Sequence, residues 1–370
     1  MRSRVVGFPA LDGEALLWQR LNRHTATGPI AGDNQQETEE LFLHVLILGA
    51  AGMVGRKLVE RLKRDGRLGN DAITKMTLQD VVAPAPPENS GFPVKTIAGD
   101  FAVAGFAEQL VADRPDVIFH LAAIVSGEAE LDFDKGYRIN LDGTRMLLDA
   151  IRLVGGGYKP RVVFTSSIAV FGAPFPDAIG DEFFHTPLLS YGTQKAIGEL
   201  LLADYSRRGF MDGIGIRLPT ICIRPGLPNK AASGFFSNIL REPLAGKEAV
   251  LPVSEEVRHW HASPRSAAGF LIHAATMDSA AAGARRNLTM PGLSATVGEQ
   301  IAALKRVAGD KVAARIKREP DPFIIGIVDG WPRNFDASRA RKLGFTTAEK
   351  TFDDIIRIHI EDELGGDFVH

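Results

Sequence analysis

Short apolar runs alternate with longer amphipathic stretches along most of the chain. The runs have the length of single strands, and strands are expected at residues 43–49, 74–80, 94–100, 116–123, 161–167, 213–222 and 286–292. Helices are expected between them at 54–66, 133–154 and 191–209, and later at 297–309 and 352–364. Apolar strands that alternate with helices of crossover length predict an α/β fold, a doubly wound parallel sheet covered on both faces.

The pattern divides the chain into three parts. Residues 1–42 are polar and irregular, and they are expected to form a poorly ordered extension. Residues 43–224 carry the strand–helix alternation and predict a nucleotide-binding domain. Residues 225–370 are rich in Pro, Gly and Ala at their start and predict a smaller substrate-binding region, with residues 262–292 returning to the sheet.

Composition narrows the class of protein. The 370 residues have a formal net charge of −2, which gives no sign of a nucleic-acid partner. No apolar run reaches the ~20 residues that span a bilayer. Cys222 is the one cysteine, so an intrachain disulfide is excluded, and its apolar neighbours indicate a buried side chain. A cytoplasmic enzyme without a metal site is expected.

Three glycines lie between the first strand and the first helix, in the stretch LILGAAGMVGRKL. Gly49 would allow the sharp exit from the strand, Gly52 the approach of a pyrophosphate to backbone N–H groups, and Gly55 close packing of the helix. Glycines also gather in ordinary turns, but a turn that joins a strand to a helix is the context that such a phosphate site requires.

Two aspartates end the second and third strands. Asp80 is placed to accept hydrogen bonds from ribose hydroxyls and to repel a 2′-phosphate, which favours NAD over NADP. It could instead simply begin the turn that follows. Asp100 could contact the adenine, or equally cap the helix after it.

Tyr191 and Lys195 lie four residues apart and therefore on one face of a helix. Ser166 and Ser167 end the fifth strand some 24 residues earlier. A tyrosine has an ordinary pKa of about 10, and a nearby ammonium and a cationic nicotinamide are expected to lower it. Serine could then hold a substrate oxygen while Tyr191 moves the proton during hydride transfer.

These motifs together resemble the extended short-chain dehydrogenases/reductases. The resemblance includes HLAA at 120–123, NLDGT from Asn140 and SSIAVFG from Ser166, and it implies a Rossmann domain that binds NAD(H). It also implies that Tyr191, Lys195, Ser167 and Asn140 are catalytic, with Asn140 supporting the lysine through a water. The implied NAD-binding residues are Gly49, Gly52, Met53, Val54, Gly55, Asp80, Asp100, Leu121, Ala122, Ala123, Tyr191, Lys195 and Pro219.

The family includes nucleotide-sugar epimerases, dehydratases and simple dehydrogenases. The Ser167-Ile168-Ala169 run lacks the acid pair of the dehydratases, and the stretch VRHWHASPRSA departs from the pattern with which epimerases hold a diphosphate. Several stretches, among them RLPTICIRPGLPNKAASGFF, instead resemble dehydrogenases that oxidise the 2-hydroxyl of a four-carbon sugar acid. An epimerase that holds NAD tightly is the alternative hypothesis for the function, and a non-enzymatic NAD sensor is a third hypothesis.

A small sugar acid calls for a cationic clamp and several hydroxyl or amide contacts. The expected substrate-binding residues are Ser126, Ser167, Tyr191, Arg224, Asn229, Ser233 and His261. Arg224 could bind the carboxylate bidentately, or could form a structural ion pair. His259 and His261 flank Trp260, and packing is an alternative for both. The family resemblance further implies a homodimer formed through the helices of Asn140 and Tyr191.

Overall fold

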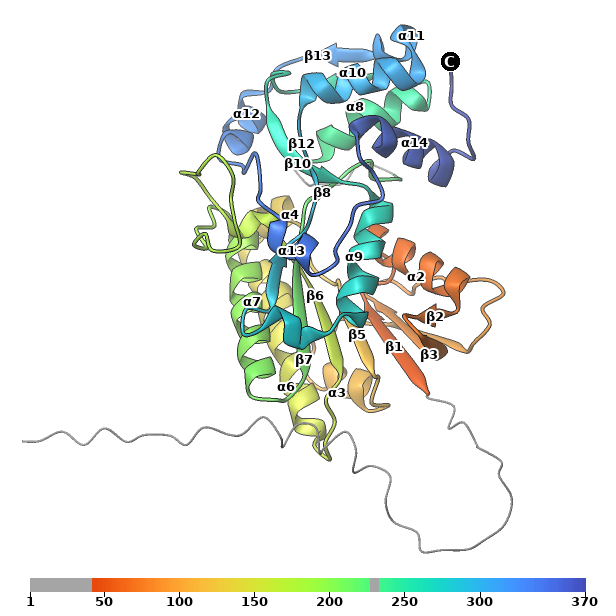
Figure 1. Ribbon diagram of the computed structural model, residues 1–370, viewed down its shortest axis with the longest axis vertical. Helices are drawn as coiled ribbons and strands as arrows, with labels where there is room; N and C mark the ends of the chain where they lie inside the picture. Colours follow the sequence, from red (N-terminus) through yellow and green to blue (C-terminus); the bar gives the residue numbers. More distant parts are fainter. Residues whose placement is uncertain (1–41, 227–232) are drawn as a thin grey trace, which may run out of the picture. The chain divides into compact units, whose positions relative to one another are not determined.

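The computed structural model describes residues 42–226 and 233–370, and a parallel β-sheet lies at its centre (Figure 1). The eight-stranded sheet has the order β4–β3–β1–β5–β6–β7–β11, with β2 paired antiparallel to β3. Its strands are β1 (Leu43–Leu48), β2 (Arg67–Leu68), β3 (Asp71–Asp80), β4 (Val94–Ala98), β5 (Val117–His120), β6 (Arg161–Ser167), β7 (Asp212–Leu218) and β11 (Asn287–Thr289). The predicted α/β fold with a Rossmann-type sheet is confirmed. The predicted N-terminal extension lies outside the described residues, save for Phe42.

The order of the strands determines where a crevice forms at the edge of the sheet. The chain passes from β1 to β3 and β4 on one side, then returns to β5, β6 and β7 on the other. Crossovers that leave β1 and β5 in opposite directions open a crevice at their carboxyl ends. The ends of β1, β5 and β6 therefore supply the residues that border it.

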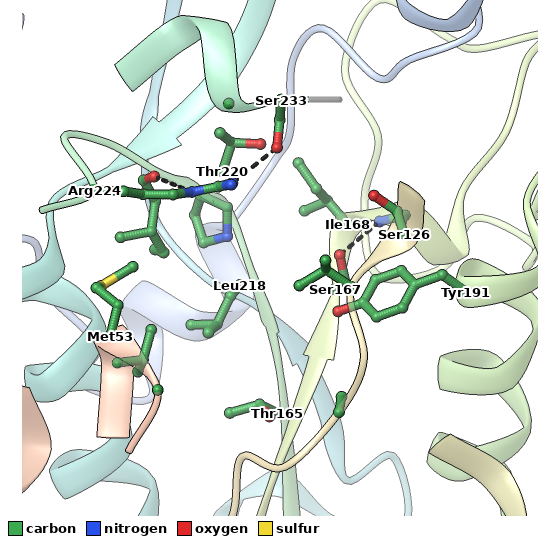
Figure 2. Close-up of a pocket in the computed structure, with 18 of the residues that line it drawn as sticks. Met53, Ser126, Thr165, Ser167, Ile168, Tyr191, Leu218, Thr220, Arg224 and Ser233 are labelled. Atoms are coloured by element: carbon green, nitrogen blue, oxygen red, sulfur yellow. Dashed lines mark hydrogen bonds between the residues drawn. The ribbon is translucent and has the colours of Figure 1, made fainter. Parts of the chain in front are cut away.

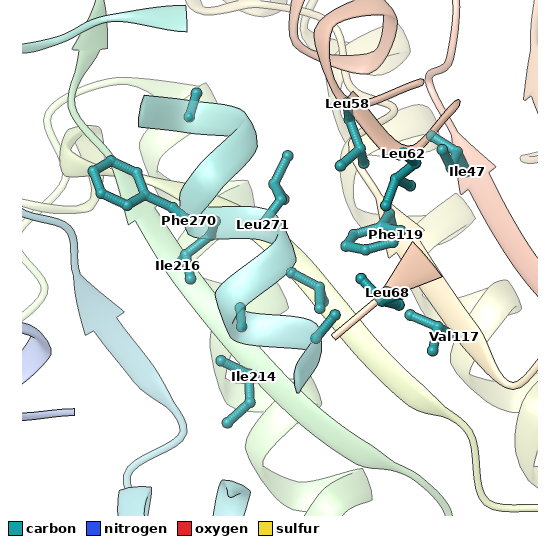
Figure 3. Packing of buried hydrophobic residues seen from close by; sticks show 14 of the residues in the cluster. Ile47, Leu58, Leu62, Leu68, Val117, Phe119, Ile214, Ile216, Phe270 and Leu271 are labelled. Atoms are coloured by element: carbon teal, nitrogen blue, oxygen red, sulfur yellow. The ribbon is translucent and has the colours of Figure 1, made fainter. Parts of the chain in front are cut away.

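Two helical layers cover the sheet. Helices α2 (Met53–Asp65) and α9 (Pro264–Thr276) cover one face, while α3 (Phe106–Val111), α6 (Thr144–Val154) and α7 (Ser190–Arg207) cover the other (Figure 1). Alternate residues of β1 serve the two layers: Val45 and Ile47 join the cluster of α2 and α9 (Figure 3), and Leu46 and Leu48 join the opposite one. Burial on both faces explains why the strand is a continuous apolar run rather than an alternating one.

The helix expected over residues 133–154 is present with an internal change of pitch. Helix α5 (Phe133–Gly136) leads into a π-helical stretch, Tyr137–Gly143, which leads into α6. π-Helical insertions widen a helix locally and are frequent at functional sites. Here the insertion carries Asn140.

A second group of elements follows the sheet. Strands β8 (Thr220–Ile221), β10 (Arg258–Ala262) and β12 (Leu293–Thr296) form a three-stranded sheet, and β9 (Ala249–Leu251) pairs with β13 (Ile316–Arg318). Helices α8 (Gly234–Leu244), α10 (Val297–Ala308) and α14 (Phe352–Glu363) enclose an apolar cluster of their own. Helix α9 and strand β11 instead pack on and extend the large sheet. The predicted helices at 297–309 and 352–364 are confirmed.

The single strand expected at 213–222 is wrong. Strand β7 ends at Leu218, and Thr220–Ile221 forms β8, which pairs with β10 of the smaller sheet. Pro219 separates the two because proline has no N–H to donate to a strand ladder. The chain thereby passes from one sheet to the other directly beside the crevice.

The remaining helical elements are short and lie in connections. They are α4 (Ser126–Leu131), η2 (Ile168–Val170), η3 (Ser279–Ala282), α11 (Asp310–Ala313), α12 (Pro322–Asp329) and α13 (Ser338–Lys342). Within the described ranges, no helix combines the length and the apolar character needed to cross a membrane.

Replacing Gly55 by Ala is expected to destabilise the protein. A Cβ at Gly55 would overlap Gly49 O and lie 2.8 Å from Ala50 Cα, so the helix would have to move away from the turn. We expect the free energy of unfolding to fall by about 3 kcal/mol, as in other overpacked sites. Urea denaturation measures this change.

Gly269→Ala is the matched control for that substitution. Gly269 lies in α9, and a Cβ there would meet no atom within 4 Å. The free energy of unfolding should rise by about 0.5–1 kcal/mol, because alanine favours the helix. A Gly55→Ala protein as stable as the wild type would contradict the close packing at the turn.

Candidate active site

One cavity of about 410 Å³ lies over the carboxyl ends of β1, β5 and β6 (Figure 2). The glycine turn and the first residues of α2 form its lower part. The remainder is formed by the residues that follow β5, by the end of β6 and the residues from there to the start of α7, by the segment from Leu218 to Pro225, and by helix α8, together with His259, Trp331 and Pro332. It is therefore bordered by both the large sheet and the second group of elements.

The glycine turn has the form of a phosphate cradle. Gly49 has φ +85°, and a Cβ there would lie 2.6 Å from Ala122 N, so only glycine fits. Gly52 is the N-cap of α2, and neither a capping side chain nor an acidic residue occupies the first helical turn. The first N–H groups of a helix have no intrahelical partner and carry partial positive charge. The turn therefore fits the pyrophosphate of a dinucleotide, and Met53, Val54 and Gly55 line the same cavity.

The two strand-end aspartates are both engaged within the chain. Asp80 Oδ2 accepts from Ala51 N at 2.9 Å, which ties the carboxylate to the glycine turn, and Oδ1 accepts from Val81 N. Asp100 Oδ1 accepts from Ala102 N, and its Oδ2 lies 2.6 Å from Arg138 Nη1. Asp80 thus begins a turn and also lies beside the cradle. Asp100 closes the turn at Ala102 and pairs with Arg138, and the alternative that it caps the next helix is wrong, because α3 has Gly105 as its N-cap and no capping side chain.

Asn140 fixes the segment that follows β5. Its Oδ1 accepts from Ile124 N at 2.9 Å, and its Nδ2 donates to Ile124 O and to Gln194 Oε1. These bonds join the π-helical stretch to α7 and to the residues after strand β5. Leu121 and Ala123 line the cavity there, and the backbone of Ala122 closes on Gly49. The predicted support of Lys195 by Asn140 through a water stays a prediction.

Tyr191, Lys195 and Ser167 meet at the cavity, as Figure 2 shows for the tyrosine and the serine. Ser167 Oγ accepts from Ala169 N at 3.1 Å, which holds the hydroxyl at the end of β6. Lys195 Nζ donates to Thr165 O at 2.8 Å and lies 5.8 Å from the centre of the Tyr191 ring. Three of the four predicted catalytic residues are therefore brought together from β6 and α7, whereas the fourth, Asn140, does not line the cavity.

Burial controls the protonation of this group. It raises the pKa of Tyr191 to about 12, against the opposing effects of the Ser167 hydroxyl and the charge of Arg224. It lowers the pKa of Lys195 to about 7, against the opposing charge of Glu199. In the protein chain by itself the tyrosine shift is thus opposite to the expected one, because desolvation of the phenolate dominates.

A buried ion pair lies directly behind the catalytic group. Glu199 is fully buried, and it accepts from Arg217 Nε at 2.9 Å, from Arg217 Nη2 at 2.7 Å and from Ser166 Oγ. Burial alone would raise the pKa of Glu199, but hydrogen bonds from His185 and Arg217 hold it below its ordinary value. The pair joins β6, β7 and α7 at the level of Ser167 and Lys195.

Arg224 and Ser233 form part of the opposite wall (Figure 2). Arg224 Nη2 donates to Ser233 Oγ at 2.8 Å, and Nε donates to Ile221 O at 3.1 Å. Within residues 42–226 and 233–370, no carboxylate forms an ion pair with Arg224, so the predicted alternative of a structural ion pair has no partner there. Ser126 and Pro219 also line the cavity. Asn229 lies outside the described residues.

His261 does not line the cavity, and its expected contact with substrate is wrong for this arrangement. Its ring is fully buried against Phe236 and Phe352, and its Nε2 lies 3.0 Å from Gln300 Nε2. His259 lines the cavity instead. Residues two apart on a strand share a face, so the sequence spacing could not show which of the two histidines lines the cavity. The packing of α8, α10 and α14 determines it.

Several lining residues were not predicted from the sequence. They are Val125, Thr165, Ile168, Ala169, Leu189, Leu218, Thr220, Ile221, Pro225, Gly234, Ser237, Asn238, Arg241, Trp331 and Pro332, together with Ser166. Thr165, Ser166, Ile168 and Ala169 flank the predicted Ser167, and Thr220, Ile221 and Pro225 lie beside Pro219 or Arg224, so the neighbouring predicted residues could have indicated them. Ser237, Asn238, Arg241, Trp331 and Pro332 instead come from segments that carry no local motif. In the described part of the chain, no group of three His, Cys, Asp or Glu residues could hold a metal ion.

A family model described as the NAD dependent epimerase/dehydratase family matches residues 45–283. The chain belongs to this family. Its cofactor is NAD, and it is an NAD-dependent dehydrogenase. The uncapped start of α2 and the tight contact at Gly49 are the features of this epimerase/dehydratase-family chain that fit the dinucleotide.

Curated relatives match almost end to end. The chain is 46% identical to D-erythronate dehydrogenase of Cupriavidus necator over 86% of this chain and 98% of that one. It is 42% identical to D-erythronate dehydrogenase of Haemophilus influenzae over 87% and 100%. A solved structure, described as the nucleoside-diphosphate-sugar epimerase from Agrobacterium tumefaciens, is 65% identical with a TM-score of 0.86, covering 93% and 99% of the two chains.

Replacing Glu199 by Gln is expected to destabilise the protein strongly. The amide removes one of the two carboxylates that pair with buried Arg217, and leaves Asp181, whose Oδ1 lies 3.3 Å from Arg217 Nη1, as the other. Breaking a buried ion pair costs about 3–5 kcal/mol, and because Asp181 still compensates part of the charge of Arg217, we expect a loss at the lower end of this range, about 3 kcal/mol. Urea denaturation measures the loss.

The same substitution at Glu361 serves as the control. Glu361 pairs with Arg265 at the surface, with 61% of its side chain exposed. Exposed pairs contribute about 1 kcal/mol or less, so Glu361→Gln should unfold almost like the wild type. Equal losses for the two variants would show that burial of Glu199 adds nothing.

Proposed function

We propose that this dehydrogenase oxidises the 2-hydroxyl of D-erythronate, a four-carbon sugar acid, to the 2-keto acid. The observation that carries the proposal is Arg224, a guanidinium in the cavity wall with no carboxylate paired to it in the described ranges. A planar guanidinium matches a carboxylate through two parallel hydrogen bonds. The names and lengths of the curated relatives support the same substrate.

The catalytic roles follow from the wall opposite Arg224. Ser167 Oγ holds the substrate 2-hydroxyl, and Tyr191 takes the proton of that hydroxyl as the C2–H bond breaks and the C2–O double bond forms. NAD, when bound, supplies the acceptor for the hydride that leaves C2. The Ser167 hydroxyl and the charge of Arg224 oppose the raised pKa of Tyr191. Lys195, when protonated, would further stabilise the phenolate from its position 5.8 Å from the centre of the ring.

Asp80 is proposed to select NAD over NADP. Its carboxylate is held at the edge of the glycine turn by Ala51 N. A carboxylate in this position can accept hydrogen bonds from the ribose hydroxyls and would repel a 2′-phosphate. The other NAD-binding residues expected from the sequence are also proposed to bind NAD, because most of them line the cavity or its glycine edge.

Nucleotide-sugar epimerisation is the second candidate. The solved structure that shares 65% identity is described as a nucleoside-diphosphate-sugar epimerase, and this favours it. A diphosphate requires basic side chains in the cleft, but Arg258 pairs with Glu299, and Arg265 pairs with Glu361 and Asp362. Neither of these arginines lines the cavity. The acid substrate is therefore the better supported of the two.

A homodimer formed through α6 and α7 is also proposed. Leu153 on α6 and Leu200 on α7 are apolar side chains left 65% and 64% exposed in the single chain. Burial of such side chains against a second copy would be favourable. The cytoplasm is also proposed as the compartment, since the sequence has one cysteine and therefore no intrachain disulfide that would need an oxidising environment.

Production of NADH distinguishes the two reactions. We expect the absorbance of NADH to rise when the protein is given NAD and D-erythronate, and no net NADH to form with UDP-glucose. A panel of four- to six-carbon 2-hydroxy acids extends the assay, and the UDP-sugar products are separated by chromatography. Interconversion of UDP-sugars with no NADH from any acid would overturn the dehydrogenase proposal.

Replacing Tyr191 by Phe is expected to lower kcat at least a hundredfold. The substitution removes the proton acceptor and retains the ring, while the glycine turn that binds the cofactor is untouched. The rate of NADH formation measures kcat, and quenching of intrinsic fluorescence by NADH measures cofactor binding. A kcat close to that of the wild type would remove Tyr191 from the proton-transfer step.

A further inference from the structure

Thr220, His259 and Pro332 form a short hydrogen-bonded chain in the cavity wall. His259 Nδ1 lies 2.8 Å from Pro332 O, and His259 Nε2 lies 2.7 Å from Thr220 Oγ1. All three residues line the cavity, yet His259 is only 4% exposed. The ring is further held by Phe236, which stacks on it at 5.2 Å.

The direction of each hydrogen bond in this chain is determined. A backbone carbonyl can only accept, so His259 Nδ1 carries the proton that is donated to Pro332 O. Burial lowers the pKa of His259 to about 4, so the ring is neutral and its Nε2 is an acceptor. Thr220 must therefore donate its one hydroxyl proton to His259.

A threonine whose proton is committed in this way can only accept further hydrogen bonds. Its oxygen has lone pairs but no proton for the ligand, so it pairs with a hydroxyl and not with a carbonyl or carboxylate oxygen. Figure 2 shows Thr220 with Arg224 and Ser233 on one side of the cavity, and Ser167 and Tyr191 on the other. In the proposed reaction, Ser167 and Tyr191 bind the substrate hydroxyl that is oxidised. The partner of Thr220 is therefore a different hydroxyl of the same substrate.

We propose that Thr220 accepts a hydrogen bond from a non-reacting hydroxyl of the substrate, and that His259 is the positioning residue that keeps Thr220 an acceptor. The cavity would then select 2-hydroxy acids that carry a further hydroxyl at C3 or C4. This inference rests on the proposed function and specifies which sugar acids the site accepts. In this proposal Arg224, in the same wall, binds the carboxylate, which all of these acids share. The hydrogen bond to Thr220 then distinguishes sugar acids from plain hydroxy acids.

Two substrates separate this contact from the rest of the site. D-erythronate has hydroxyls at C2, C3 and C4, whereas (R)-2-hydroxybutanoate has the same C2 configuration without the other two. The ratio of kcat/KM for the two acids measures recognition of the extra hydroxyls. We expect Thr220→Val to lower this ratio about tenfold, mainly through KM for D-erythronate, as for loss of one buried hydrogen bond.

Thr220→Ser is the matched control, because it keeps the hydroxyl and removes only a methyl group. The serine variant should retain most of the wild-type ratio. His259→Phe keeps an aromatic ring against Phe236 but removes the acceptor for the threonine proton. Without that acceptor, the Thr220 hydroxyl is no longer held with its lone pairs toward the ligand, so the ratio should fall, though by less than in Thr220→Val. Binding of NADH and thermal unfolding confirm that each variant is folded.

The outcomes separate failure of the inference from failure of the proposed function. A wild-type protein that oxidises D-erythronate, with the same ratio in Thr220→Val as in the wild type, overturns the inference alone. A ratio lowered equally by Thr220→Ser and Thr220→Val also overturns it, because the hydroxyl would then not be the cause. A wild-type protein that oxidises no acid of the panel overturns both.

Discussion

The buried ion pair between Glu199 and Arg217 is the constraint on which the geometry of the proposed catalytic residues depends. Tyr191, Lys195 and Glu199 recur every four residues on α7 and so share one face of the helix. Glu199 binds Arg217 of β7 and Ser166 of β6, which fixes the helix against both strands. Ser167 is adjacent to Ser166, and Lys195 lies one turn before Glu199. The arrangement of the serine, the tyrosine and the lysine is therefore constrained by Glu199 and Arg217, which do not line the cavity.

The same pair offsets the electrostatic cost of the site. Lys195 is buried, and its hydrogen bond is to the carbonyl of Thr165 rather than to a carboxylate. The charge of Glu199 opposes the loss of its proton, and Arg217 in turn keeps Glu199 ionised. A lysine whose pKa is brought near 7 can change its protonation with small changes in its surroundings, and the charge it presents to Tyr191 changes with it.

Sequence patterns predicted what depends on local chemistry. The apolar runs located seven of the eight strands of the large sheet because its central strands are buried on both faces, whereas the two-residue strand β2 was not predicted. The glycine turn followed from its place between strand and helix. Pro219 is visible in the sequence, but the separation of β7 from β8 that it causes is not. This separation follows from the pairing of β8 in the smaller sheet. Strand β10 (RHWHA) was not predicted, because segments distant in sequence bury its polar residues. Glu199 with Arg217, and His259 with Thr220, are long-range pairs that no local pattern could show.

The two walls of the cavity make different demands on a ligand, and together they restrict its size. The wall of β6 and α7 supplies a proton acceptor and a hydroxyl, which suit any secondary alcohol. The opposite wall supplies Arg224 without a carboxylate partner in the described ranges, whereas Arg241 there is paired with Glu242. One guanidinium left for a ligand matches one carboxylate better than a diphosphate, which needs several cations. The proposed substrate would place its carboxylate on that guanidinium and its reacting hydroxyl on Tyr191, across the same cavity, and a 2-hydroxy acid carries these two groups on adjacent carbons.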